Sequence, residues 1–339
     1  MGGALGLDPQ LVRARTLLNL DSEEDGEVVI GCAGGARATL RVPLAWREPA
    51  PGLETRRLVV SGLRGGHSGV QIHEGLGNAI RSLGRILLEA RRQAGTMELA
   101  GVAGGSAENA IPREASALVR VADASLLERV ANEVAATLRA ELAGVDEGLS
   151  VELRSEPEPD RVVSGPDGER AIDLLAALPH GVLAMSRALR GIVETSINLG
   201  VVATDERELT IVLHARSSNE PALDGVLASV EARARLAGAS AELGSRYPGW
   251  QPQPDSRLLQ VTRDAYRAVY GTEPRVTAIH AGLECGALAQ RLPGIEMVSF
   301  GPEIRAPHSP AERVSVESVG RFWAVLRAVL EALAAPAPG

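Results

Sequence analysis

Two stretches of the chain, beginning near Arg57 and near Ala171, show the same succession of helix and strand patterns. In the first, "RLVVSGL" predicts a strand, and apolar residues then recur at helical spacing from Leu76 to Ala90. "SALVRVA" predicts another strand, and a helical pattern through Leu126 follows it, with Asp123 or Ser125 available as the N-cap. The repeated order limits the chain to folds that combine sheets and helices.

The second stretch adds a pattern typical of a sheet with one buried face. After a helical "AIDLLAAL", "TSINLGVV" and "ELTIVLHAR" predict two strands, and a helix from Leu223 stops at Gly238. In "ELTIVLHAR", apolar Leu209, Ile211 and Leu213 occupy every second position, so their side chains share one face of the strand. This alternation is typical of antiparallel sheets that bury one face. Two such units side by side predict an α+β domain with helices on one face of antiparallel sheets.

The two ends of the chain predict a second domain, and two domains are what we expect for a chain of 339 residues. Residues 11–20 run into an acidic segment without a preceding strand and helix, as in a domain whose front is missing. After "YPGWQPQPDS", a helix, the strand "EMVSFG" and a last helix indicate a return to that first domain. We predict an α/β fold with residues 1–36 and 247–339 in one domain and residues 37–246 inserted as another.

Composition excludes several classes of function. The chain contains no lysine, so a phosphate-binding Gly-Lys-Ser/Thr loop, a Schiff-base lysine and a Ser-Lys dyad are ruled out. A net charge of −8 argues against nucleic acid as a partner. Cys32 and Cys285 form neither a disulfide framework nor a thiolate zinc site. Without a membrane-length apolar run or a signal-peptide pattern, we expect a soluble cytoplasmic protein.

The segment "GGHSGVQIH" allows three interpretations. Gly66 and Ser68 fit a Gly-x-Ser-x-Gly nucleophile elbow, but Val70 occupies the last glycine position. His67 and His73 lie six residues apart in a glycine-rich loop, a spacing without a preferred metal-binding geometry. The third interpretation is a loop that presents an imidazole to a substrate.

Asp21 and His308 are candidate metal ligands. Asp21 follows an apolar strand, and ligands bind at the carboxyl ends of strands in α/β sheets. The alternative for Asp21 is a solvated acidic loop. His308 lies between two prolines, which restrict the backbone and reduce the entropy lost when a ligand is held in place.

Asn109 and Arg216 are polar residues in apolar surroundings. Asn109 begins a turn before a predicted strand, and Arg216 ends "ELTIVLHAR". A guanidinium group binds a carboxylate through two parallel hydrogen bonds. The alternatives are an Asx-turn for Asn109 and a surface cap for Arg216.

Several blocks of the sequence together resemble one family, the aminoacyl-histidine (Xaa-His, carnosine-type) dipeptidases of the di-zinc aminoacylase/carboxypeptidase clan. The matching blocks are "NLDSEEDGEVVIGCAGG", "GLRGGHSGVQIHEGLGNA", "NAIPREA", "VETSINLGVV", "YPGWQP", "IHAGLECG" and "GPEIRAPHSPAERVSVESVGRFW". The resemblance implies a homodimeric dipeptidase in which a lid domain, here residues 37–246, interrupts an α/β catalytic domain.

The resemblance also implies roles for individual residues. Asp21 matches the carboxylate ligand of one zinc ion, and His308 matches the histidine ligand of the other. His67 matches the lid histidine that hydrogen-bonds the developing oxyanion. Asn109 and Arg216 match groups that hold the terminal carboxylate of the dipeptide, and Glu284 is a weaker candidate on the substrate side.

The resemblance further implies a first third, with a His-x-Asp motif, a bridging aspartate and a glutamate pair, for which this sequence has no counterpart. Asp21 and His308 alone cannot hold two ions. We therefore expect an N-terminally truncated chain that shows no zinc-dependent cleavage of carnosine by itself. The alternatives are a non-catalytic peptide-binding or dimerisation module, and a split enzyme that a separate N-terminal chain completes.

Overall fold

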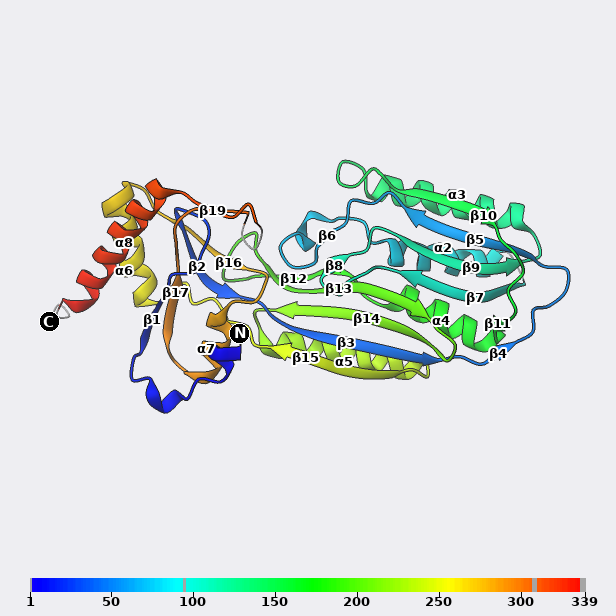
Figure 1. Ribbon diagram of the computed structural model, residues 1–339, viewed down its shortest axis with the longest axis horizontal. Coiled ribbons are helices and arrows are strands. Elements are labelled where there is room, and N and C mark those ends of the chain that lie inside the picture. Colours follow the sequence, from blue (N-terminus) through cyan, green and yellow to red (C-terminus); the bar gives the residue numbers. More distant parts are fainter. Residues whose placement is uncertain (1, 94–95, 307–309, 336–339) are drawn as a thin grey trace.

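The computed structural model describes residues 2–93, 96–306 and 310–335, so that His308 lies outside the described residues. The chain forms two parts, each with its own sheet: a small part, which contains both described ends, and an elongated larger part (Figure 1). Separate hydrophobic cores fill them. The mixed α/β fold predicted from the sequence is confirmed.

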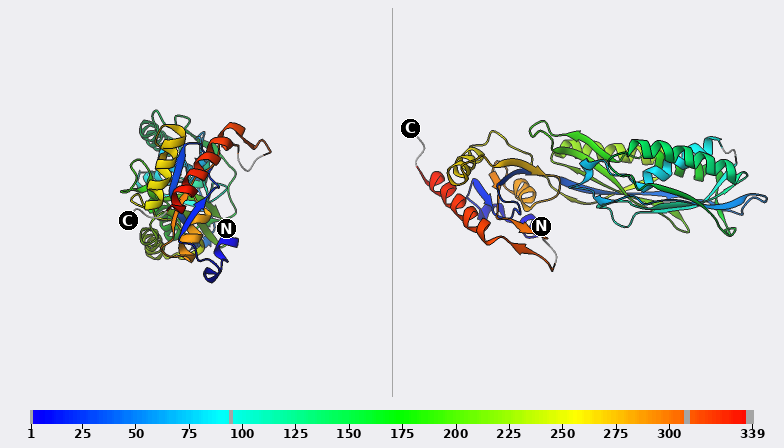
Figure 2. Two further views of the ribbon diagram at one scale, coloured as in Figure 1. Left: turned by 90° about the vertical axis from the view of Figure 1, so that its left-hand side faces the viewer. Right: turned by 90° about the horizontal axis from the view of Figure 1, so that it is seen from above.

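The larger part is a nine-stranded antiparallel sheet with helices on one face. Figure 2 shows the helices on one side of this sheet and the opposite face open along most of its length. Its strands, in sheet order, are β10 (Ser150–Ser155), β5 (Glu54–Ser61), β9 (Ala115–Val121), β7 (Met97–Gly104), β13 (Val193–Thr204), β14 (Glu208–Ser217), β3 (Gly34–Pro43) and β15 (Ser240–Tyr247), with β12 (Gly181–Met185) beside β13. The helices are α2 (Ala79–Gln93), α3 (Ala124–Glu141), α4 (Gly165–Ala177) and α5 (Glu220–Leu236). The predicted antiparallel sheet with helices on one face is therefore confirmed.

The strand order shows that this sheet consists of two equivalent halves. In chain order, the first half has β5, β7, β9 and β10, and the second has β3, β13, β14 and β15. From its outer edge inward, each half places its fourth, first, third and second strand, and β7 and β13 then pair antiparallel at the centre. A helix follows the third strand in both halves, α3 in the first and α5 in the second. The first half is inserted between β3 and α4 of the second half.

Local sequence explains where these two helices begin. Asp123 accepts a hydrogen bond from the Leu126 backbone N–H at the start of α3, and Asn219 accepts one from Ala222 at the start of α5. Short polar side chains at this position satisfy N–H groups that have no partner within the helix. Asp123 is thus the N-cap, rather than Ser125.

The small part has a mixed four-stranded sheet. In sheet order its strands are β1 (Thr16–Asn19), β17 (Glu296–Ser299), β2 (Glu27–Cys32) and β16 (Arg275–Ile279). Of residues 11–20, Thr16–Asn19 form strand β1, which lies at the edge of the described sheet, where Asn19 pairs with Ser299. The helices are α6 (Arg257–Tyr270), α7 (Glu284–Arg291) and α8 (Val316–Ala334).

Short elements complete the fold. They are α1 (Gly2–Leu5), η1 (Pro9–Leu11), β4 (Trp46–Arg47), β6 (Gly66–His67), η2 (Ile72–Glu74), β8 (Ala110–Ile111), β11 (Val162–Val163), β18 (Ile304–Arg305) and β19 (Arg313–Val314). None of the helices in the described ranges is long and apolar enough to span a bilayer.

The chain passes between the two parts at two places that lie against each other. Cys32 and Trp250 exchange two backbone hydrogen bonds of 2.9 Å. A Cβ at Gly34 would lie 2.5 Å from the Gly249 nitrogen, so this close approach requires glycine. The outgoing and returning segments are thus held together beside the inner end of β14.

Candidate functional site

Six polar side chains gather where the second half of the large sheet meets the small part. We call this group, formed by Ser196, Asn198, His214, Arg216, Tyr247 and His280, the polar cluster. Four of them keep one buried side-chain atom without a hydrogen-bond partner among the described residues: Asn198 Oδ1, His214 Nδ1, Arg216 Nε and His280 Nδ1. Since each such buried atom costs about 1–3 kcal/mol, the cluster is suited to bind a polar ligand.

Arg216 is the charged residue of the cluster and is 4% exposed. Burial lowers the pKa of Arg216, whereas the nearby Tyr247 and Glu108 raise it. Arginine stays protonated in such sites. Its Nη1 donates a 2.7 Å hydrogen bond to the Tyr247 hydroxyl, while its Nε has no partner among the described residues. A buried cation without a paired carboxylate is a strong binding site for an anion.

A glycine lets Tyr247 reach Arg216. Gly35 on β3 lies between Arg216 on β14 and Tyr247 on β15, and the three residues are in register. β14 and β15, the strands on either side of β3, are about 10 Å apart. The ring of Tyr247 spans this distance by lying over the position that a side chain at Gly35 would occupy.

Two buried histidines of the cluster are neutral. Burial, followed by the charge of Arg216, lowers the pKa of His280 to about 3. Burial, Arg216 and His67 lower that of His214 to about 4. His280 Nε2 and the Ser196 hydroxyl form a 2.7 Å hydrogen bond, which joins the small part to the large sheet.

His67 presents a hydrogen-bond donor beside this cluster. Its Nδ1 accepts hydrogen bonds of 3.2 Å from the backbone N–H groups of Gly69 and Val70. Burial and the charge of Arg216 lower the pKa of His67, so the ring is neutral at pH 7. A neutral imidazole that accepts at Nδ1 carries its proton at Nε2. The loop therefore holds an N–H donor in a fixed orientation.

Asn109 lies next to the His67 loop. Its carbonyl oxygen accepts a 2.8 Å hydrogen bond from the Ser68 backbone, and its side chain is exposed. Asn198 Nδ2 donates to the carbonyl oxygens of Glu108 and Ala110, both at 2.8 Å, and so fixes the turn on either side of Asn109.

The elbow interpretation of this loop gains no support. The Ser68 hydroxyl is buried and has no hydrogen-bond partner among the described residues, so no neighbouring base activates it.

The other predicted site residues lie in the small part. Asp21 is exposed just after β1, and residues 300–304 run beside it, since Ile304 donates to the Glu23 carbonyl oxygen at 2.8 Å. His308 falls outside the described residues. Glu284 is exposed at the start of α7, where its charge contributes to the raised pKa values of Cys32 and Cys285, mainly an effect of burial. Within the described ranges, no recorded interaction joins Asp21 or Glu284 to Arg216.

The described side chains do not form a complete metal site. Across residues 2–93, 96–306 and 310–335, no three His, Cys, Asp or Glu side chains gather as metal ligands. Asp21 therefore belongs to no such group among the described residues, and catalytic zinc takes three protein ligands.

Sequence reasoning missed five members of the cluster: Ser196, Asn198, His214, Tyr247 and His280. All five stand in or beside the segments "VETSINLGVV", "ELTIVLHAR", "YPGWQP" and "IHAGLECG". Polar residues within such apolar strands were the available signal.

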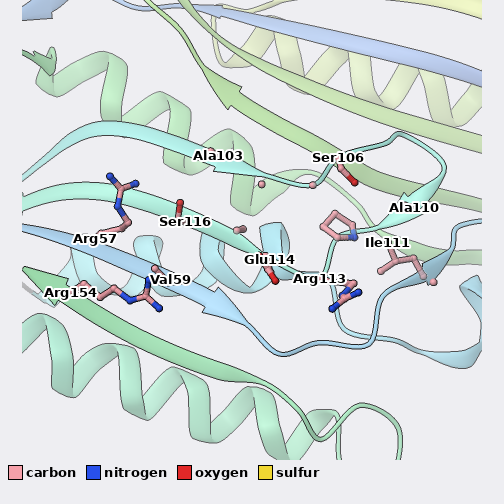
Figure 3. A pocket seen from close by; sticks show the side chains of 15 residues that line it. Arg57, Val59, Ala103, Ser106, Ala110, Ile111, Arg113, Glu114, Ser116 and Arg154 are labelled. Carbon is pink, nitrogen blue, oxygen red and sulfur yellow. The ribbon is translucent and has the colours of Figure 1, made fainter. Parts of the chain in front are cut away.

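The large sheet also has a cavity of about 690 Å³ on its open face, over strands of its first half (Figure 3). Its basic wall consists of Arg57, Arg113 and Arg154. Arg57 already pairs with Glu156 at 2.7 Å and Arg154 with Glu152 at 2.6 Å. This cavity therefore lacks the unpaired buried charge that marks the polar cluster.

Comparisons with known proteins agree with one another. The protein-family model described as a peptidase dimerisation domain matches residues 59–146, which lie in the first half of the large sheet. The chain is 39% identical over 338 residues to the cytosol non-specific dipeptidase of Escherichia coli K12, and the alignment covers 99% of this chain and 69% of that protein. The structure of aminoacylhistidine dipeptidase from Vibrio alginolyticus superimposes with a TM-score of 0.95 at 39% identity, covering 98% of this chain and 68% of that one.

Proposed function

The chain belongs to the aminoacylhistidine and cytosol non-specific dipeptidases of the M20 peptidase family, and we propose that it binds dipeptides of the Xaa-His type for metal-dependent hydrolysis. Dipeptidase activity, a hydrolase function, follows from this membership. The substrate class comes from the names of the two relatives and from the chemistry of the polar cluster.

One observation carries the proposal: Arg216 is buried and charged, and no carboxylate of the described residues is hydrogen-bonded to it. A dipeptide supplies a terminal carboxylate that can accept from the free guanidinium N–H groups. Asn109 is proposed to complete this carboxylate site, because its turn is fixed against β13 by Asn198. Glu284, exposed at the start of α7, is also proposed to lie on the substrate side.

His67 is proposed to act on the scissile carbonyl group. Its Nε2–H donor lies beside the cluster, and its fixed ring loses little entropy when it donates. Donation to a developing oxyanion stabilises the transition state more than the ground state.

Zinc is the proposed metal, with Asp21 and His308 as ligands. The described residues do not complete its coordination, so we derive no step through the metal. Hydrolysis then depends on ligands beyond the described residues, and we propose that the polar cluster by itself binds the dipeptide without cleaving it.

The domain division, assembly and location are also proposals. Residues 37–246 are proposed as the lid and dimerisation domain, with residues 1–36 and 247–339 in the catalytic domain; the dimerisation-domain match at residues 59–146 supports a homodimer. The relative named a cytosol dipeptidase supports a cytoplasmic location.

Binding is tested by isothermal titration calorimetry with carnosine and with its C-terminal amide. Carnosine is expected to bind, and the amide to bind about 10- to 100-fold more weakly because it lacks the charge that Arg216 recognises. Arg216→Met should remove the preference for carnosine, whereas Arg41→Met, a matched change at an exposed arginine on the neighbouring strand, should keep it. Equal affinity of the wild-type chain for both ligands would contradict the proposed carboxylate site.

Hydrolysis is tested separately, by measuring histidine release from carnosine with added zinc. Turnover that a chelator abolishes and that His308→Ala removes would establish the catalytic part for this chain. Binding without turnover is the result expected if ligands beyond the described residues are needed.

A further inference from the structure

The two equivalent halves of the large sheet each contain a buried arginine at the same position. Arg120 on β9 stands three residues before Asp123, the N-cap of α3, and Arg216 on β14 stands three residues before Asn219, the N-cap of α5. β9 and β14 are the third strands of their halves. Both arginines lie on the open face, because Val119 and Val121 on either side of Arg120, and Ala215 before Arg216, belong to the core under the helices. Arg120 is 0% exposed and, like Arg216, has an Nε without a partner among the described residues.

The two arginines differ in what their guanidinium groups contact. Arg120 donates to Glu98 at 3.0 Å and to Glu158 at 2.9 Å, and also to the carbonyl oxygens of Ala50 and Leu53. Arg216 donates to the Tyr247 hydroxyl, and the structure records no carboxylate bound to it. Arg120 thus has two carboxylate partners, of which Glu98 belongs to the first half and Glu158 follows β10.

The strand register identifies the residue responsible for this difference. Glu98 on β7 lies directly opposite Arg120 on β9. Ser196 on β13 lies directly opposite Arg216 on β14. β7 and β13 are the second strands of the two halves, so Glu98 and Ser196 occupy equivalent positions. Ser196 has no charge, and its hydroxyl bonds His280 instead.

We propose that Ser196 determines the specificity of the site: by standing where the other half has a glutamate, it leaves Arg216 open to a carboxylate of the ligand. This inference rests on the proposed function for the identity of that ligand. In the first half, the carboxylate of Glu98 lies directly opposite the arginine. The carboxylate of the ligand would take the equivalent position opposite Arg216. A ligand without an anionic group cannot take that position without leaving the guanidinium unpaired.

The test places a carboxylate at position 196. Ser196→Glu is compared with Ser196→Gln, which has the same size and no charge, in the wild-type chain and in Arg216→Met. The midpoint of thermal unfolding and the affinity for carnosine are measured for each full-length chain. We expect Ser196→Glu to unfold at a higher temperature than Ser196→Gln, and this advantage to disappear in the Arg216→Met background. Ser196→Glu should weaken carnosine binding at least 30-fold relative to wild type, and more than Ser196→Gln does.

The proposal is overturned if Ser196→Glu is no more stable than Ser196→Gln, if its advantage persists without Arg216, or if it still binds carnosine with wild-type affinity. The proposal is also overturned if Ser196→Glu fails to fold while Ser196→Gln folds. If neither variant folds, the shorter pair Ser196→Asp and Ser196→Asn is compared in its place, with the same outcomes deciding. Should the wild-type chain not bind carnosine at all, the proposed function fails. The stability comparison then still decides whether position 196 faces Arg216 as Glu98 faces Arg120.

Discussion

Tyr247 holds Arg216 through a 2.7 Å hydrogen bond from Nη1 to its hydroxyl oxygen, and it does so across the strand that separates them. The tyrosine oxygen thereby fixes one side of a buried guanidinium group that has no recorded carboxylate partner. Orientation of a cationic group before the ligand arrives reduces the entropy lost on binding.

Tyr247→Phe should weaken carnosine binding about tenfold, because a hydrogen bond to a charged group is lost while the ring is kept. Calorimetric titration measures this change. Tyr270→Phe serves as the control, since the Tyr270 hydroxyl bonds Asp25 in the small part and not the cluster. An unchanged affinity in Tyr247→Phe would show that Arg216 is positioned without it.

Gly35→Ala should impair binding and lower stability together, because its Cβ would overlap the phenol ring of Tyr247. Gly244→Ala on β15 is the matched control, since a Cβ there meets the Arg37 side chain at an ordinary 3.6 Å. Urea unfolding and carnosine titration of the two variants give the comparison. Equal behaviour of the two would mean that the ring of Tyr247 moves aside freely.

Glu98→Ala should destabilise the fold by about 3–5 kcal/mol, because it removes a buried carboxylate bound to Arg120, which has a fully buried side chain. Glu152→Ala breaks an exposed pair with Arg154 and should cost about 1 kcal/mol or less. Chemical unfolding measures both values. A loss at Glu98 no greater than at Glu152 would contradict the structural role of the Arg120 ion pair.

The stability of the protein should rise with pH between about 4 and 6.5 partly because of His214. Its pKa in the folded chain is about 4, lowered mainly by burial, whereas that of an unfolded histidine is about 6.5. Between these values the unfolded chain binds the extra proton, so lowering the pH favours unfolding.

His214→Gln should reduce the slope of the free energy of unfolding against pH in this window by up to about 1.4 kcal/mol per pH unit. Urea titrations at several pH values supply the measurement, and equal slopes for wild type and His214→Gln would refute the neutral state of His214.

Much of the fold could be predicted because its signals are local. The helical spacing that predicts α2 and the strand pattern of β9 depend on residues close in the chain, as does the capping by Asp123. The pairing of β1 with β17 could not be predicted, because the two strands are far apart in the chain and no local pattern relates them. The equivalence of the two halves depends on strand order in space, although the repeated helix and strand patterns indicated it.

The candidate site could be predicted only in part. Family resemblance pointed to His67, Asn109 and Arg216, and the structure brings the segments that carry them together. The alternation in β14 predicted one buried face, yet Val212, His214 and Arg216 on the other face are buried too. Tertiary contacts with the turn at residues 107–110 and with His280 enclose that face, and no local pattern in the strand reports them. The burial of Arg120 could not be predicted either, because it depends on a tertiary contact with the segment around Ala50.

The insertion of one half of the large sheet into the other has a consequence for how the chain is synthesised. The first half, from β5 to β10, is continuous in sequence and can assemble once β10 has left the ribosome, because its four strands pair with one another. β3 emerges earlier but pairs with β14 and β15, which are made after the entire first half. A nascent chain must therefore keep this mostly apolar strand from associating with other polypeptides until its neighbours have been translated, which makes β3 the segment where chaperone binding would matter most.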